Sequence, residues 1–94
     1  MRITLYEQEC CNQQYEFQNV PIVCTPAFIE TFGEQYAIII FLALEMIEMK
    51  YPKKNWDYLQ TFSVEDKTFW IISDALQGRH HRDEHITFLL PTDY

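Results

Sequence analysis

The sequence predicts an α+β fold, in which one main helix packs on a mostly antiparallel sheet of four or five strands. An uncharged apolar run at 36–44, YAIIIFLAL, contains no helix breaker and leads through a mixed segment to Lys50. Segments with alternating side chains, typical of strands, precede and follow it. Only two glycines and four prolines among the 94 residues leave room for few long loops, so we expect residues 1–94 to form one domain.

The chain before the helix is predicted to be extended. Residues 2–7, RITLYE, alternate Ile3 and Leu5 with other side chains, which indicates a strand. A polar loop is expected next. Residues 15–23 continue as extended chain, and Pro21 favours an edge strand or a bulge there because proline cannot donate a hydrogen bond to a neighbouring strand.

Helical signals begin at Thr25. Its hydroxyl can accept a hydrogen bond from the free N–H groups of a helix start, and Pro26 suits the first helical position. The side chains expected to face the core from this turn are Phe28, Ile29 and Phe32. Gly33 then allows a break or kink before a longer helix at about 34–50.

The longer helix is apolar over most of its circumference. Its core-facing stripe is predicted at Ile40, Leu44 and Ile47, widened by Tyr36, Ile39 and Leu42. The solvent side is predicted at Glu34, Gln35, Glu45 and Glu48. A helix that is apolar on so many sides is expected to be covered on several of them, and we expect it to lie across the sheet.

The second half of the chain predicts a hairpin and a last strand. Residues 58–64 and 68–73 have strand patterns, and the polar residues 65–67 between them suggest a tight connection. A polar loop around Gly78 then leads to a last strand at 85–90.

The net charge of −7 comes from 14 acidic and 7 basic residues. It argues against binding to DNA or RNA, whose phosphates would repel the chain. Between residues 3 and 49 there is no lysine or arginine. The carboxylates of that stretch are Glu7, Glu9, Glu16, Glu30, Glu34, Glu45 and Glu48. Acidity of this kind often serves solubility alone, and that interpretation stays open beside a docking role.

The charge pattern predicts a small acidic interaction protein that acts by protein–protein contact. If the carboxylates share a face, they form a negative surface that fits a protein partner with a basic surface. The residues predicted to bind it are Glu30, Glu34, Glu45 and Glu48. One concrete form is an inhibitor that occupies the basic nucleic-acid channel of a host defence enzyme. Another alternative is a structural homodimer joined through an exposed strand edge.

A histidine-rich segment at 79–85 provides a further alternative, a metal-binding or enzymatic domain. His81, Glu84 and His85 spell H-x-x-E-H, a zinc pattern that needs a helix to align both imidazoles and a third ligand. Gly78 precedes the segment and a strand pattern begins at His85, so we expect a solvated loop, no metal or other cofactor, and no enzyme activity. The alternative would use His80, His81, Asp83, Glu84 and His85.

The cysteines and the absence of an apolar leader predict a cytoplasmic protein. Cys10 and Cys11 are adjacent and could pair only with strained geometry, while Cys24 has the apolar surroundings of a small core residue. An odd cysteine count without a leader is typical of a reducing compartment. The apolar run at 36–44 is too short to cross a membrane and Glu45 follows at once, so we expect no membrane association.

The segment Asp57-Tyr58-Leu59-Gln60-x-Phe62 and the helix and turn before it resemble the centre of an uncharacterised bacterial family, the domain-of-unknown-function family numbered 960. The resemblance covers about residues 20–64. It implies an extended start, an amphipathic helix and a DYLQ-x-F strand, and an origin in Gram-positive bacteria and their phages or other mobile elements. It implies no activity.

Overall fold

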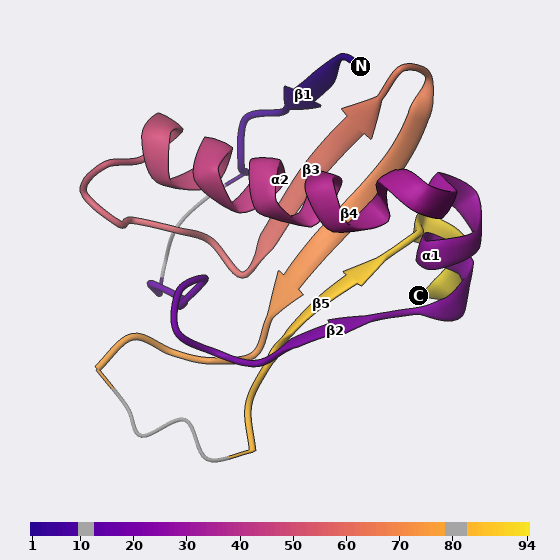
Figure 1. The fold of residues 1–94 in the computed structure, drawn as a ribbon. Helices are drawn as coiled ribbons and strands as arrows, with labels where there is room; N and C mark the ends of the chain where they lie inside the picture. Colours follow the sequence, from indigo (N-terminus) through magenta and orange to yellow (C-terminus); the bar gives the residue numbers. More distant parts are fainter. Residues whose placement is uncertain (10–12, 79–82) are drawn as a thin grey trace.

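The computed structural model describes residues 1–9, 13–78 and 83–94, which form one sheet with helices on one of its faces (Figure 1). The strands are β1 (Ile3–Leu5), β2 (Ile22–Cys24), β3 (Leu59–Val64), β4 (Lys67–Ser73) and β5 (Ile86–Leu89). The α-helices are α1 (Pro26–Phe32) and α2 (Tyr36–Lys50), and the 3₁₀ turns are η1 (Gly33–Gln35) and η2 (Pro91–Asp93). The predicted α+β class is confirmed.

The five strands lie in the order β1-β3-β4-β5-β2. Three neighbouring pairs are antiparallel and β2 pairs with β5 in parallel, so the sheet is mixed but mostly antiparallel. β2 lies at an edge, as Pro21 predicts. β3 and β4 form the expected hairpin, whose turn lies at Glu65 and Asp66. Glu65 has a φ of 58°, because this tight turn needs the left-handed conformation and has no glycine.

The helix start at Thr25 is confirmed. Its hydroxyl accepts a hydrogen bond from the Phe28 N–H at 3.2 Å and donates one to Asp93 Oδ2 at 2.7 Å, which ties α1 to the C-terminal turn. Gly33 ends the helix with a φ of 55°, which glycine adopts at little steric cost. The prediction that Ile29 faces the core is wrong: the side chain is 37% exposed, since Phe28 takes the buried side of this short helix.

An aromatic cluster forms the centre of the core between the helices and the sheet. The Phe69 ring centroid lies 5.0 Å from that of Phe62 and 5.3 Å from that of Phe28. Phe88 and Phe32 complete the cluster at 6.1 Å and 5.6 Å from Phe69. These rings come from α1, β3, β4 and β5, so the cluster links elements that lie far apart in the sequence.

The side of α2 that packs on the sheet differs from the predicted stripe. The buried residues are Ile39, Ala43 and Ile47, spaced four apart, whereas Ile40 and Leu44 are half-buried at the flank. The prediction that the helix is covered on several sides is also wrong. The described residues place one sheet against one side of α2, and Figure 1 shows the opposite side facing away from the rest of the fold.

Candidate functional site

The side of α2 that faces solvent combines carboxylates with large apolar side chains. We call it the outer α2 face, formed by Ile38, Phe41, Glu45 and Glu48 of α2 together with Glu34 of the preceding turn η1. Successive spacings of four and three residues place these side chains along one stripe, opposite buried Ala43. Ile38 is 52% exposed and Phe41 is 60% exposed. A stripe with exposed aromatic and aliphatic side chains between charges is typical of a surface that binds another protein.

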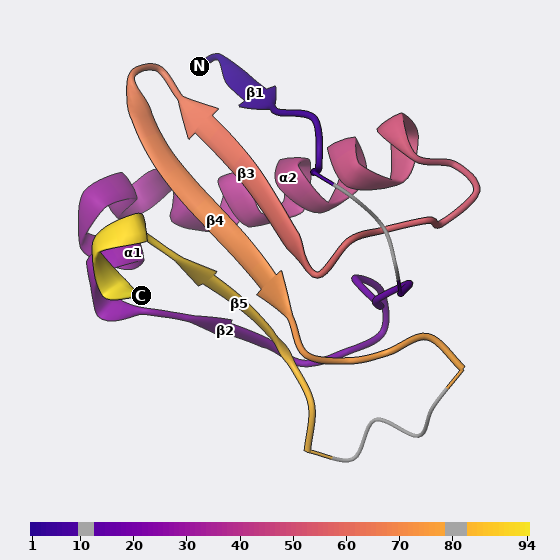
Figure 2. The same ribbon diagram turned by 180° about the vertical axis from the view of Figure 1, so that it is seen from behind.

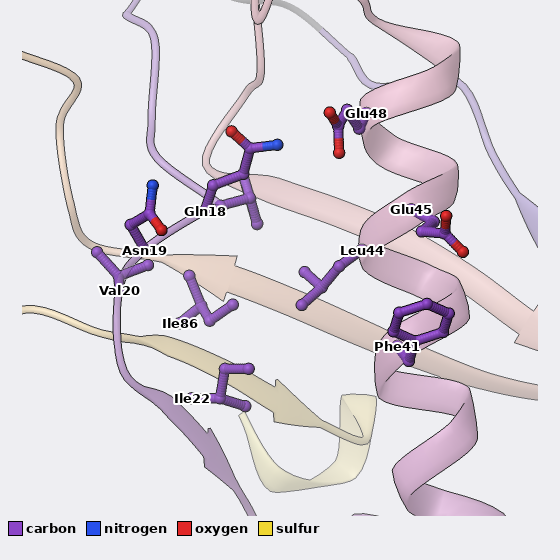
Figure 3. Close-up of a pocket in the computed structure, with 10 residues that line it drawn as sticks. Gln18, Asn19, Val20, Ile22, Phe41, Leu44, Glu45, Glu48 and Ile86 are labelled. Atoms are coloured by element: carbon purple, nitrogen blue, oxygen red, sulfur yellow. The ribbon is translucent and has the colours of Figure 1, made fainter.

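A groove of about 210 Å³ lies beside this face, between α2 and the segment that leads into β2 (Figure 3). In the close-up, Leu44 points from α2 toward Ile86, and Ile22 lies next to them. The helix side of the groove is formed by Phe41, Glu45 and Glu48, and the opposite rim by Gln18 and Asn19. The groove therefore has an apolar floor and a polar, partly acidic rim, which suits one apolar side chain with a cation beside it.

A second, more open hollow of about 310 Å³ lies on the other flank of α2, next to β1. Its lining includes Leu5, Met46, Met49 and Lys50. The Lys50 ammonium donates a hydrogen bond to the Leu5 carbonyl at 3.3 Å and forms an ion pair with Glu7 at 3.5 Å. Because Glu7 balances this positive charge, the acidic rim of the first groove makes the better site for a basic partner.

The structure brings together three of the four carboxylates that the sequence predicts as binding residues. Glu34, Glu45 and Glu48 are exposed and share the outer α2 face. Glu30 is also exposed but lies on α1, before the break at Gly33. The sequence analysis did not identify Phe41 as a site residue. The sequence signal for Phe41 was a helix that is apolar on all sides. In the described part of the chain a single sheet packs on one side of this helix, so apolar side chains on the opposite side face solvent.

The histidine alternative lies partly outside the described residues, since His80 and His81 are not among them. At the described end of the motif, the His85 N–H donates to Asp74 Oδ1 at 2.8 Å, and the Asp74 N–H donates to the His85 carbonyl at 3.3 Å. These bonds lead the chain into β5 and not into a helix. Within the described ranges, no three His, Cys, Asp or Glu side chains lie close enough to hold a metal ion. The absence of a metal site stays a prediction.

Cys24 is half-buried on β2 and packs against the core, although it is not fully inside it. Burial raises the pKa of its thiol, so the neutral form dominates at pH 7. Because the thiolate is the nucleophile, Cys24 is a poor candidate for covalent catalysis. The other two cysteines, Cys10 and Cys11, lie outside the described residues.

The DYLQ segment has a structural role. The Asp57 carboxylate accepts a hydrogen bond from the Tyr58 N–H at 2.9 Å. The Gln60 side chain is fully buried, and its Nε2 donates to Gln8 Oε1 at 2.7 Å and to the Asp57 carbonyl at 3.1 Å. Gln8 also accepts from the Asp57 N–H at 2.9 Å and donates to the Asn55 carbonyl at 2.9 Å. These bonds join the N-terminal segment to the connection between α2 and β3.

We expect Gln8→Ala to lower the free energy of unfolding by about 1–3 kcal/mol, because it leaves the buried Gln60 amide with one partner fewer. Urea unfolding followed by tryptophan fluorescence measures the change. Gln14→Ala is the matched control, since the side chain of Gln14 is exposed, and it should change stability by less than about 0.5 kcal/mol. Equal midpoints for Gln8→Ala and the parent would contradict the proposed role of this network.

One stretch, Pro26–Lys50, is long and apolar enough to cross a membrane by length and composition alone. In the structure, the left-handed Gly33 interrupts it and Ile39 and Ile47 pack on the sheet. Glu45 and Glu48 would have to enter the hydrocarbon layer at considerable cost. The absence of membrane association stays a prediction.

Comparisons of the chain with protein-family models, with curated proteins and with solved structures find no match. The resemblance of the DYLQ segment to family 960 therefore stays a prediction. Arguments about function rest on the geometry and charge of the outer α2 face and its groove.

Proposed function

We propose that this chain is an interaction protein that binds a protein partner with a basic surface through the outer α2 face and the adjoining groove. The observation that carries the proposal is the exposure of Ile38 and Phe41 on the same stripe as three carboxylates. A solvated acidic face needs no exposed aromatic ring, whereas a docking face gains affinity from one.

The two kinds of side chain have different roles in such a complex. Fully burying a phenylalanine side chain contributes roughly 1.5–3 kcal/mol, so Phe41 is the expected anchor of the contact. Glu45 and Glu48 stand at the rim of the groove, where charge pairs contribute more to the association rate and to orientation than to affinity. The matching partner surface has an apolar side chain flanked by lysine or arginine.

Nucleic-acid-binding proteins form the class of partner that best fits this chemistry. Their binding sites are basic along a groove or channel, often with aromatic side chains exposed between the cations. A chain with a net charge of −7 and an acidic, partly apolar face competes for such a site. We therefore keep inhibition of a nucleic-acid-binding host defence enzyme as the specific form of the proposal.

A designed amphipathic peptide, with lysines flanking leucine and phenylalanine at helical spacing, provides a probe before any natural partner is known. We expect Phe41→Ser to weaken its binding about tenfold or more, because the apolar anchor is lost. The triple variant Glu34→Gln, Glu45→Gln and Glu48→Gln should slow association about tenfold at low salt. Fluorescence anisotropy and stopped-flow kinetics measure the two effects.

The matched control removes three carboxylates elsewhere: Glu9→Gln, Asp66→Asn and Asp83→Asn, which are all exposed. Both triple variants have the same net charge, so a difference between them reports position and not total charge. Association should also slow as salt is raised, since the Debye length falls from about 10 Å at 0.1 M to about 3 Å at 1 M. Equal association rates for the two triple variants would overturn the proposal. So would an affinity for the probe peptide that Phe41→Ser leaves unchanged.

Charge reversal at Glu30 distinguishes binding through the outer α2 face from attraction by the net charge of the whole chain. Because it lies on α1 and not on the outer α2 face, Glu30→Lys should slow association less than Glu45→Lys. The two substitutions change the net charge equally, and both positions are exposed. An equal loss of association rate would mean that the partner contacts α1 as well.

A further inference from the structure

Within the described residues, the second face of the sheet carries no α-helix, and only the 3₁₀ turn η2 lies against it, next to β4. Figure 2 shows the sheet in front and the helices behind it, so both α1 and α2 lie on the same side. Because side chains alternate along a strand, the residues between the core positions of β3, β4 and β5 point to this side. We call it the open sheet face, with its centre at Leu59, Thr61, Trp70, Ile72, Thr87 and Val23.

The pairing register places these side chains next to one another. Thr61 is paired with Trp70, Leu59 with Ile72, and Thr87 with both Ile72 and Val23. The outward positions within the five described strands include no charged residue, in a chain where 22% of residues are charged. Val23 is 43% exposed, and the other side chains of the centre are half-buried.

The chain itself covers the periphery of this face at two places: the Tyr6 hydroxyl lies 3.1 Å from the Ser63 hydroxyl, and Leu89 is buried near the C-terminal turn. The Tyr94 ring lies with its centroid 5.8 Å from that of Trp70, in an edge-to-face arrangement. The rest presents β-branched and aromatic side chains to solvent, together with hydroxyls. Sheets that face water normally carry polar and charged residues at the outward positions, so this composition indicates contact with another molecule.

We infer that the open sheet face joins two copies of this chain in a symmetric dimer. Each copy has a net charge of −7, so two copies repel wherever their carboxylates meet, and the centre of this face has none. Threonine and serine hydroxyls both donate and accept hydrogen bonds, so a surface that contains them complements itself, as a two-fold interface requires. At the outward positions of the described strands, a basic partner finds no carboxylate and a nucleic acid finds no cation.

The strand edges are less suited to joining two copies. The Pro21 carbonyl and the Thr25 N–H bond to β5, which leaves only Ile22 and Cys24 with backbone groups pointing out from β2. Prolines at 21 and 26 bracket this short edge. At the other edge, the Leu5 carbonyl of β1 already accepts a hydrogen bond from Lys50.

The size of the face sets the expected strength of the dimer. The five strands contain 23 residues, which at about 3.4 Å per residue and about 4.8 Å between strands give a flat area on the order of 400 Å² per copy. The total is on the order of 800 Å², below the roughly 1,600 Å² of a standard interface. We therefore expect a weak dimer that dissociates on dilution.

Sedimentation velocity on the intact chain, from about 5 to 500 µM, tests the dimer. The parent should shift from monomer to dimer across this range. Thr61→Glu should abolish the shift because it places a carboxylate at the centre of the face of each copy. Thr87→Glu is the second variant, and circular dichroism identifies whichever variant keeps the fold. Phe41→Glu, on the outer α2 face, is the control with the same charge change and should leave the dimer intact.

Salt distinguishes this interface from the proposed function. Raising the salt concentration should strengthen the dimer, because it screens the repulsion between two acidic chains, whereas it should weaken binding of the basic probe peptide. A parent that stays monomeric at the highest concentration would overturn the inference. A dimer that survives Thr61→Glu and Thr87→Glu but is lost with Phe41→Glu would also overturn it, and would place self-association on α2.

Discussion

Phe69→Ala is expected to lower the free energy of unfolding by about 3–5 kcal/mol, the largest effect that we predict for a single substitution. The Phe69 side chain is fully buried, and its ring contacts the rings of Phe28, Phe32, Phe62 and Phe88 at centroid distances of 5.0–6.1 Å. Removing it opens a cavity where α1 meets β3, β4 and β5. It also removes edge-to-face and stacked pairs that contribute beyond their buried area.

The loss is large compared with the stability of a chain of this size. At roughly 0.05–0.15 kcal/mol per residue, 94 residues give about 5–14 kcal/mol in total. Urea unfolding should therefore show a much lower midpoint, or a chain that is already partly unfolded in buffer. Phe69→Leu keeps most of the volume and should cost clearly less.

Thr68→Ala is the positional control for this substitution. Thr68 lies next to Phe69 on β4 but is exposed, so its truncation should change stability by less than about 0.5–1 kcal/mol. If Phe69→Ala and Thr68→Ala unfold at similar midpoints, the assignment of the two faces of β4 is wrong.

A truncation series along α2 should give the second largest effect and tests which side of this helix packs on the sheet. Ile47→Ala should cost about 2–5 kcal/mol because Ile47 is fully buried. Leu44→Ala should cost less, since Leu44 is half-buried at the groove, although the sequence alone predicts a full core position there. Phe41→Ala should stay within about 0.5 kcal/mol of the parent, because Phe41 is 60% exposed.

The order of the three effects matters more than their absolute size. All three substitutions place alanine in the same helix, and the helix propensities of the three residues replaced differ by less than about 0.7 kcal/mol, so larger differences report packing. Chemical denaturation with one probe, in one buffer, measures the series. A loss at Phe41 as large as the loss at Ile47 would mean that a second layer covers the outer α2 face, and the docking proposal would lose its basis.

The local elements follow from the sequence because their signals are local. Alternating side chains predict β3 and β4, and the hydroxyl of Thr25 next to Pro26 predicts the start of α1. Gly33 predicts the break because only glycine adopts its left-handed conformation at little cost. Even the place of β2 at a sheet edge follows from Pro21.

The side of α2 that packs on the sheet could not be predicted in this way. A helix that is apolar all round contains no directional signal, so the stripes at Ile39 and at Ile40 are equally plausible from the sequence. The choice depends on the shape of the sheet below, where Ala43 allows close approach and Ile39 and Ile47 fill the space beside it.

The candidate site likewise has some features that follow from the sequence and others that depend on the tertiary structure. The sequence by itself determined the charge: Glu34, Glu45 and Glu48 are exposed as predicted, because a carboxylate seldom loses its hydration without a partner. Only the tertiary structure decided that Ile38 and Phe41 stand beside them in solvent, and that no α-helix of the described residues covers the second face of the sheet. Both follow from the number of layers, which is set by contacts between distant segments and not by any local pattern.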